Sequence, residues 1–131
     1  MYNTHILTDE GARNVWEHGK RIGYALNLRI NYYRGLPLCC VEEISIEVDG
    51  EKVDPKDMTL QHQGKEFPYL SILEDDFPTD FYWLFGEKLR VVIKKEGGIP
   101  QGHHVVKVTL GSRRSYTPTM WATVEKDIVI A

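Results

Sequence analysis

Two adjacent pairs of residues, Cys39-Cys40 and His103-His104, carry the side chains best suited to chemistry in this sequence. A histidine can act as a general base or a metal ligand, and a cysteine thiolate can act as a nucleophile. Neighbouring residues on a strand point to opposite faces, so the two histidines cannot hold one metal ion together. No C-x-x-C, H-x-H or H-x-x-x-H spacing occurs. We therefore predict no metal site and no catalytic residue in this chain, and we interpret the cysteines as free, packed thiols.

Two loops rich in aromatic residues are the more informative feature. They are Tyr32–Pro37, with the sequence YYRGLP, and Tyr116–Trp121, with the sequence YTPTMW. Tyr, Trp, Met and Arg are enriched in the buried centres of protein interfaces, and loops at one end of a β-sandwich can converge. The run Phe81–Phe85 adds further apolar surface. We predict that the loops form an interface or the rim of a pocket through six residues: Tyr32, Tyr33, Arg34, Tyr116, Pro118 and Trp121.

The elements that would position these loops are β-strands. Polar and apolar residues alternate with the period of a half-buried strand over five ranges, 21–31, 41–49, 88–95, 103–116 and 123–130. Asp49-Gly50 is the strongest hairpin signal, and Gly64 separates two further short strands. These patterns predict an all-β, single-domain antiparallel β-sandwich of about seven to nine strands over residues 21–131. Residues 1–20 lack a clear period, and we interpret them as an N-terminal arm or edge segment.

The composition restricts the classes of function. The chain has 131 residues, of which 42% are hydrophobic, so it can bury one core without disulfides or a structural metal. Its net charge of −3 disfavours a nucleic-acid binder, which needs a surplus of Lys and Arg. No apolar stretch is long enough to span a membrane, and no signal-peptide pattern is present. Together with the unpaired cysteines, these features predict a cytoplasmic protein that binds neither nucleic acid nor a membrane.

Several strings of residues resemble one known family. The strings occur in the family's order, and the more specific parts are YRGLPL and GGIPQGHH. In this sequence the strings are Ile30–Leu38, Val41–Ile44, Val48–Val53, Trp83–Gly86, Leu89–Ile93, Gly97–His104 and Ser115–Pro118. In these strings the chain resembles the small (β) subunit of bacterial C-glycoside deglycosidases. The resemblance covers the chain from Arg21 to its C-terminal end, and the first 20 residues lie outside it.

The resemblance implies a two-part enzyme. A larger α subunit with a TIM-barrel fold would hold a divalent metal, usually Mn²⁺, and this chain would be the non-metal-binding β-sandwich packed against it in a higher hetero-oligomer. The complex would act as a lyase on flavonoid and isoflavonoid C-glycosides, cleaving the C–C bond between a 3-oxo-sugar and its aromatic aglycone. The β subunit would stabilise the α subunit, its loops are candidates for closing one side of the substrate pocket, and alone it would be inactive. The resemblance assigns no catalytic residue to this chain.

Two other classes of function stay open. In a carbohydrate-binding module, Trp83, Trp121 and Tyr116 would form an aromatic platform that stacks on sugars, and the isolated chain would bind glycans. In a stand-alone enzyme, His103 or His104 would act with a carboxylate, and the purified chain would turn over substrate. The absence of a signal peptide counts against the first class, and the absence of a nucleophile or ligand motif counts against the second.

Overall fold

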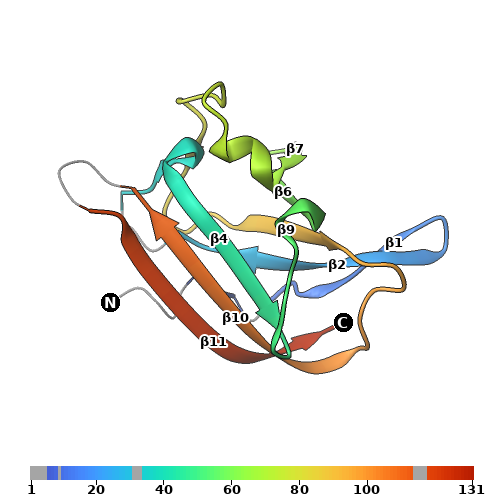
Figure 1. Cartoon of the computed structure of the whole chain (residues 1–131). Helices are drawn as coiled ribbons and strands as arrows, with labels where there is room; N and C mark the ends of the chain where they lie inside the picture. The colour runs from blue at the N-terminus through green and yellow to red at the C-terminus, as the bar shows by residue number, and fades with distance from the viewer. Residues whose placement is uncertain (1–5, 9, 31–33, 114–117) are drawn as a thin grey trace.

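Two antiparallel β-sheets packed face to face form the body of the molecule (Figure 1). The structure is a computed structural model, and it describes residues 6–8, 10–30, 34–113 and 118–131. Within these residues the chain forms eleven strands, of which three are only two residues long. The architecture confirms the predicted antiparallel β-sandwich. No helix in the described part of the chain is long and apolar enough to cross a membrane.

The first sheet has five strands. In spatial order they are β1 (Arg13–Glu17), β2 (Lys20–Leu28), β9 (Leu89–Lys94), β6 (Met58–His62) and β7 (Lys65–Pro68). Alternate residues of the three central strands face the core, so that Leu26, Leu60 and Val91 are fully buried. This alternation confirms the predicted strand around 88–95.

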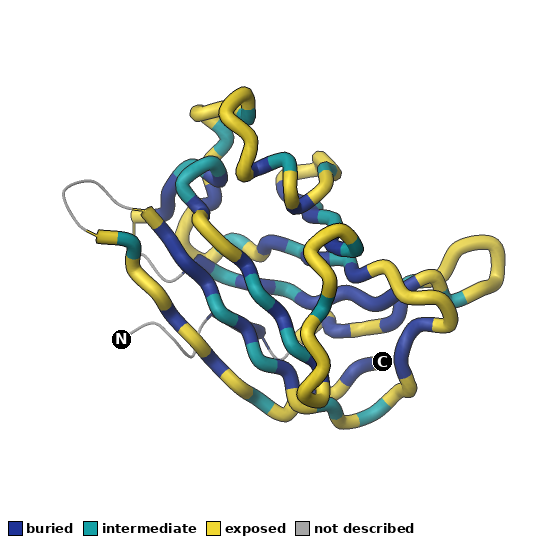
Figure 2. The backbone as a smooth tube through the Cα atoms, in the orientation of Figure 1, coloured by how far each residue is buried: buried dark blue, intermediate teal, exposed yellow. Residues whose placement is uncertain are grey.

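The second sheet has four strands. They are β11 (Met120–Ile130), β10 (Gly102–Ser112), β4 (Val41–Val48) and β5 (Glu51–Lys52). Burial alternates along its long strands, as Figure 2 shows for β10 and β11. A third, two-stranded sheet pairs β3 (Leu36–Pro37) with β8 (Tyr82–Trp83). The described residues also form short 3₁₀ helices, which are η2 (Leu38–Cys40), η3 (Pro55–Asp57) and η4 (Tyr69–Leu73).

Both predicted hairpins form, and their turns have the backbone conformation that suits twisted strands. Asp49 and Gly50 have φ angles of 52° and 83°, and Gln63 and Gly64 have φ angles of 52° and 77°. Two successive residues with positive φ are the mark of a type I′ turn, in which Gly at the second position is favoured. The first turn joins β4 to β5, and the second joins β6 to β7.

Residues before position 21 contribute to both the core and a sheet edge. Ile6 and Leu7 are buried, and the Thr8 amide donates to the Asn27 carbonyl, so this segment pairs with the end of β2. It also approaches the other sheet, because Lys126 on β11 donates from Nζ to the Leu7 carbonyl. The segment therefore covers one open side of the sandwich, and β1 forms the edge of the five-stranded sheet.

Some predicted strands have different limits in the structure. Within Phe81–Phe85 only Tyr82 and Trp83 form a strand, and only Trp83 is fully buried. Ile22 lies two residues before the buried Tyr24 on β2, but it is partly exposed. The strand predicted over 103–116 ends at Ser112, and the last strand begins at Met120 instead of 123.

Strand β4 connects the two ends of the sandwich. We call the end near its start the loop end; it comprises Arg34–Pro37, Tyr82–Phe85, Arg113 and Pro118–Trp121. We call the end near its finish the turn end; it comprises the turns 49–57 and 95–101 together with His104. Since β4 has eight residues, the two ends are separated by about 25 Å at the usual strand rise.

Candidate functional site

Three of the six residues predicted to form an interface are described by the structure. Arg34, Pro118 and Trp121 are exposed at the loop end. Tyr32, Tyr33 and Tyr116 lie outside the described residues, so their predicted role stays a prediction.

Trp121 lies flat on a glycine of the neighbouring strand. Gly111 on β10 pairs with Trp121 on β11, and a Cβ atom on Gly111 would lie only 2.6 Å from Cζ3 of the indole ring. The ring therefore occupies the space that a side chain at position 111 would fill. Trp121 remains 55% exposed, so its outer surface is available to a partner. A rigid aromatic group that exposes one face costs little conformational entropy when it is buried by binding.

A second group of apolar side chains lies around β8 at the same end. Tyr82, Leu84 and Phe85 are each about half exposed, whereas Trp83 between them is fully buried and donates from Nε1 to the Glu87 carbonyl. Gly35 holds this segment in place: its φ is +69°, and a Cβ there would lie 2.6 Å from the Trp83 carbonyl oxygen. The strand pair thus points Trp83 inward and presents its neighbours to solvent.

Arg113 connects the two loop-end segments. Its amide donates to the Cys40 carbonyl at 2.7 Å, and its guanidinium donates to the Cys39 carbonyl at 3.3 Å. Because Cys39 and Cys40 follow β3 directly and Arg113 follows β10 directly, the segments that carry the two aromatic loops leave the sandwich at one end.

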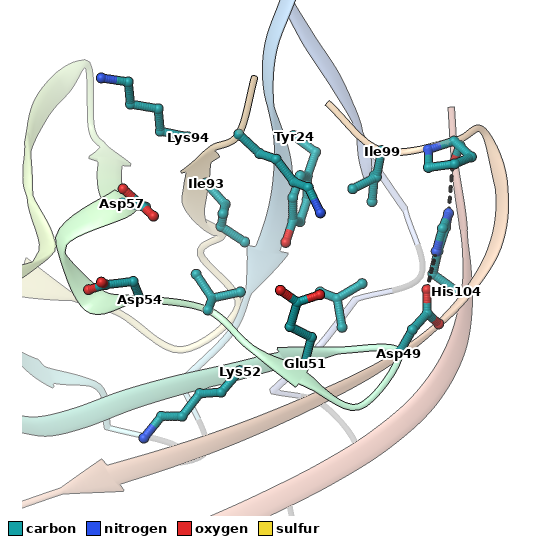
Figure 3. Close-up of a pocket in the computed structure, with 14 residues that line it drawn as sticks. Tyr24, Asp49, Glu51, Lys52, Asp54, Asp57, Ile93, Lys94, Ile99 and His104 are labelled. Atoms are coloured by element: carbon teal, nitrogen blue, oxygen red, sulfur yellow. Dashed lines mark hydrogen bonds and ion pairs between the residues drawn. The ribbon is translucent and has the colours of Figure 1, made fainter. Parts of the chain in front are cut away.

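The turn end contains a cavity of about 390 Å³ between the two sheets (Figure 3). Tyr24, Ile93 and Ile99 form part of its apolar wall. Charged side chains of both signs surround the opening; they are Asp49, Glu51, Lys52, Asp54, Asp57, Lys94, Lys95 and His104. None of the six residues predicted to form the interface lies here, but His104, the candidate of the stand-alone-enzyme alternative, does.

One wall of the cavity is a histidine held between two acceptors. His104 Nδ1 lies 2.6 Å from Oδ2 of Asp49, and its Nε2 lies 2.6 Å from the Pro100 carbonyl oxygen. The hydrogen bond to Asp49 is the main cause that raises the pKa of His104, and the same bond lowers the pKa of Asp49. Asp49 also accepts from the Val105 amide at 2.9 Å. A doubly donating imidazolium therefore ties the β4–β5 turn to the connector before β10.

Tyr24 is the buried polar group of the cavity. The residue is 3% exposed, and its hydroxyl faces the cavity without a hydrogen-bond partner among the described residues. Figure 3 shows Tyr24 and Glu51 pointing toward each other across the cavity. Burial, followed by the negative charges of Glu51 and Asp49, raises the pKa of Tyr24 to about 12. The hydroxyl is therefore neutral and available to donate or accept.

The remaining titratable groups give no sign of a metal centre or an activated thiol. Among the described residues, no three His, Cys, Asp or Glu side chains gather as a group that could hold a metal ion. Cys39 and Cys40 are free thiols. Burial, followed by the neighbouring Cys40, raises the pKa of Cys39, which disfavours the nucleophilic thiolate. The two histidines of the adjacent pair point to opposite faces, since His103 contacts Asp127 on the outer face.

Comparison with known proteins identifies the family. The model of the family described as C-glycoside deglycosidase beta subunit matches residues 2–116 of this chain. The chain belongs to this family. One relative, the C-glycoside deglycosidase beta subunit of Eubacterium cellulosolvens, is 27% identical over 114 residues, which cover 86% of this chain and 76% of the relative. Another, the 3'-dehydrocarminate deglycosidase beta subunit of a Microbacterium species, is 31% identical over 97 residues, which cover 73% of this chain and 70% of the relative.

The extent of the match corrects one expectation. We expected the first 20 residues to lie outside the resemblance, but the family match begins at residue 2. The structure gives a reason, because Ile6, Leu7 and β1 belong to the sandwich. The match ends at residue 116, so Pro118 and Trp121 lie beyond it.

The strings that carried the resemblance gather at the two ends of this beta-subunit chain. Arg34–Leu38 lies at the loop end, whereas Val48–Val53 and Gly97–His104 both line the cavity at the turn end. Sequence reasoning did not find the cavity, although two strings far apart in the chain supplied its walls. Both strings resemble the family, and this shared resemblance was the signal that could have pointed to the region.

The aromatic platform expected of a carbohydrate-binding module does not form from the three residues predicted for it. Trp83 is fully buried, so it cannot stack on a sugar at the surface. Of the other two residues, Trp121 is exposed, and Tyr116 lies outside the described residues.

Proposed function

We propose that this chain is the β subunit of a heteromeric C-glycoside deglycosidase and that its loop end binds the α subunit. Membership of the beta-subunit family supports the subunit role. The observation that carries the location is Trp121, which is fixed on Gly111 and still more than half exposed. Tyr82, Leu84 and Phe85 add a second exposed apolar group at the same end. Large apolar groups of this kind bury well in a partner's surface.

The proposed reaction is cleavage of the bond between a 3-oxo-sugar and an aromatic aglycone such as a flavonoid or isoflavonoid. The 3-oxo group acidifies the proton at C2, and a base removes it. A C1–C2 double bond then forms, the bond from C1 to the aryl carbon breaks, and the aryl carbon takes up a proton. One relative is a 3'-dehydrocarminate deglycosidase beta subunit, and this name supports an oxidised sugar as the substrate. The base and the divalent metal, Mn²⁺ in this proposal, belong to a TIM-barrel α subunit.

In this arrangement the β subunit stabilises the α subunit, and its two aromatic loops close one side of the substrate pocket. Arg34 belongs to the first loop and is a candidate to pair with an acidic group of the partner. Pro118 and Trp121 belong to the second loop. The assembly is proposed to be a higher hetero-oligomer.

A pair of matched tryptophan variants tests the docking surface. Trp121 and Trp16 are 55% and 58% exposed, but Trp16 lies on β1, where the guanidinium of Arg21 stacks on its ring. We expect Trp121→Ala to weaken α–β binding about tenfold or more. Trp16→Ala should leave binding within about threefold of the wild type. Titration calorimetry on the co-purified subunits measures both.

The two variants are compared only after circular dichroism shows the same fold. Equal losses of affinity, or no loss from Trp121→Ala, would contradict the location of the docking surface. Full deglycosidase activity on a 3-oxo-C-glucoside by this chain alone would contradict the subunit role itself. Activity that requires both chains supports it.

A further inference from the structure

We propose that the cavity at the turn end is a binding site for a small, neutral, polyhydroxylated molecule such as a monosaccharide. The site is separate from the loop end and does not depend on the function proposed above.

The first observation is the hydroxyl of Tyr24, which faces the cavity and has no hydrogen-bond partner among the described residues. The residue as a whole is only 3% exposed, it lines the cavity, and Figure 3 shows it directed toward Glu51. A ligand hydroxyl between these two groups would donate to the carboxylate of Glu51 and accept from the phenol.

The second observation is the balance of charge around the cavity. Four carboxylates line it, against three lysines and His104, whose pKa is raised. No ion pair within the described residues joins Lys52, Lys94 or Lys95 to a carboxylate. The lining therefore offers separate acceptors and donors with almost no net charge. Hydroxyl groups, which both donate and accept, match such a lining better than a group of one charge.

The third observation is that the walls are held in place before any ligand binds. His104 connects the turn at Asp49 to the Pro100 carbonyl through two hydrogen bonds of 2.6 Å each. The apolar wall of Ile93 and Ile99 is buried. A volume of about 390 Å³ falls in the lower part of the range for small-molecule sites, and apolar walls with a few convergent polar groups are typical of such sites.

The cavity lies at the far end of β4 from Arg113 and Trp121. It is therefore separate from the surface proposed to dock the partner.

The experiment uses the full chain labelled with ¹⁵N, both alone and with the unlabelled partner subunit, so that only this chain reports. D-glucose and myo-inositol are titrated as neutral probes, L-arginine as a cation and inorganic phosphate as an anion. We expect the two polyols to shift the amide signals of the turns 49–57 and 95–104 with millimolar affinity, which suits a small polar ligand. Arginine and phosphate should shift them less.

Two variants identify the groups that bind. Tyr24→Phe removes only the hydroxyl and should weaken glucose binding about tenfold. In the isolated chain, Tyr82→Phe makes the same change at an exposed tyrosine outside the cavity and should leave glucose binding unchanged. If Tyr24→Phe fails to fold, Glu51→Gln at an exposed position replaces it, with the same expected loss.

Three outcomes would overturn the proposal. They are no shift with either polyol, glucose binding that survives both cavity variants, and stronger shifts with arginine or phosphate than with the polyols. Loss of α–β association leaves the result unaffected, so this test and that of the proposed function fail separately.

Discussion

The loop end and the turn end are the two ends of the same β-sandwich, and they differ in almost every physical property. At the loop end, large apolar side chains such as Trp121 and Phe85 are exposed. At the turn end, charged residues surround a cavity, and His104 fixes its wall. The strands between them, such as β4, have the ordinary alternation of a buried sheet.

The difference shows that one core can support two kinds of surface without a change of fold. An apolar end is stable in water only at a cost, which a partner removes by covering it. A polar end, whose charged groups water can solvate, has no such need. We therefore expect substitutions at the loop end to act on assembly, except where they reach the core, and substitutions at the turn end to act on local structure or ligand binding.

The largest expected effect is at the residue of the loop end that belongs to the core. Trp83→Ala should destabilise the chain by about 3–5 kcal/mol, because it removes a fully buried indole and its hydrogen bond to the Glu87 carbonyl. Urea unfolding followed by circular dichroism measures this. The neighbouring, half-exposed Tyr82 is the control, and a comparable loss from Tyr82→Ala would contradict the contrast between the two side chains.

Substitution of one glycine at each end compares how closely the backbone is packed at the loop end and at the turn end. Gly35 and Gly50 both have positive φ, but a Cβ on Gly35 would meet the backbone of Trp83 and Leu84, whereas a Cβ on Gly50 meets nothing within 4 Å. Gly50→Ala should cost about 1–2 kcal/mol for the left-handed conformation alone. Gly35→Ala should cost more, since the backbone of β8 must also shift. Unfolding midpoints that rank the two variants in the opposite order would refute this.

The His104–Asp49 pair should make the turn end sensitive to pH. The folded-state pKa of His104 is raised above 6.5, so its contribution is complete below that pH and is lost as pH rises through the raised value. The effect should be at most about 1 kcal/mol, because the Asp49 side chain is 53% exposed and solvent screens the pair. His104→Gln should remove this decline in stability between neutral and alkaline pH. An unchanged pH profile of unfolding would show that the pair does not stabilise the fold.

The smallest effect is expected one residue away. His103 and Asp127 also form an ion pair, but their side chains are 75% and 60% exposed. Asp127→Asn should therefore leave the unfolding midpoint unchanged within experimental error. A clear shift in the midpoint would mean that solvent exposure does not explain the difference in strength between the His103–Asp127 and His104–Asp49 pairs.

The sequence predicted those parts of the fold that depend on local pattern. The alternation of Ile44, Ile46 and Val48 indicated β4 and its inward face, and Asp49-Gly50 indicated the turn that follows. The limits and burial of strands were predicted wrongly where tertiary packing overrides the local sequence pattern. Nothing local distinguishes Trp83 from its large apolar neighbours, and only the pairing of Leu36 with Trp83 turns that residue inward.

Local pattern could not bring the walls of the turn-end cavity together for the same reason. His104 and Asp49 are 55 positions apart in the chain. Tyr24 and Glu51 belong to different sheets and meet only after these pack. Residue type alone identified the exposed Trp121 and Arg34 at the loop end, because a surplus of large side chains in a loop is visible without any contact.

Lys126 has a consequence for the chain before it meets any partner. β11 is an edge strand whose eleven residues pair with β10 without interruption, and an edge this long and regular is prone to intermolecular sheet extension and aggregation. Lys126 takes an inward position between the buried Val124 and Ile128, where it reaches the Leu7 carbonyl. A second molecule adding to this edge would have to displace that contact and accommodate a charged group. The lysine thus helps to keep newly made chains monodisperse during the interval before they assemble.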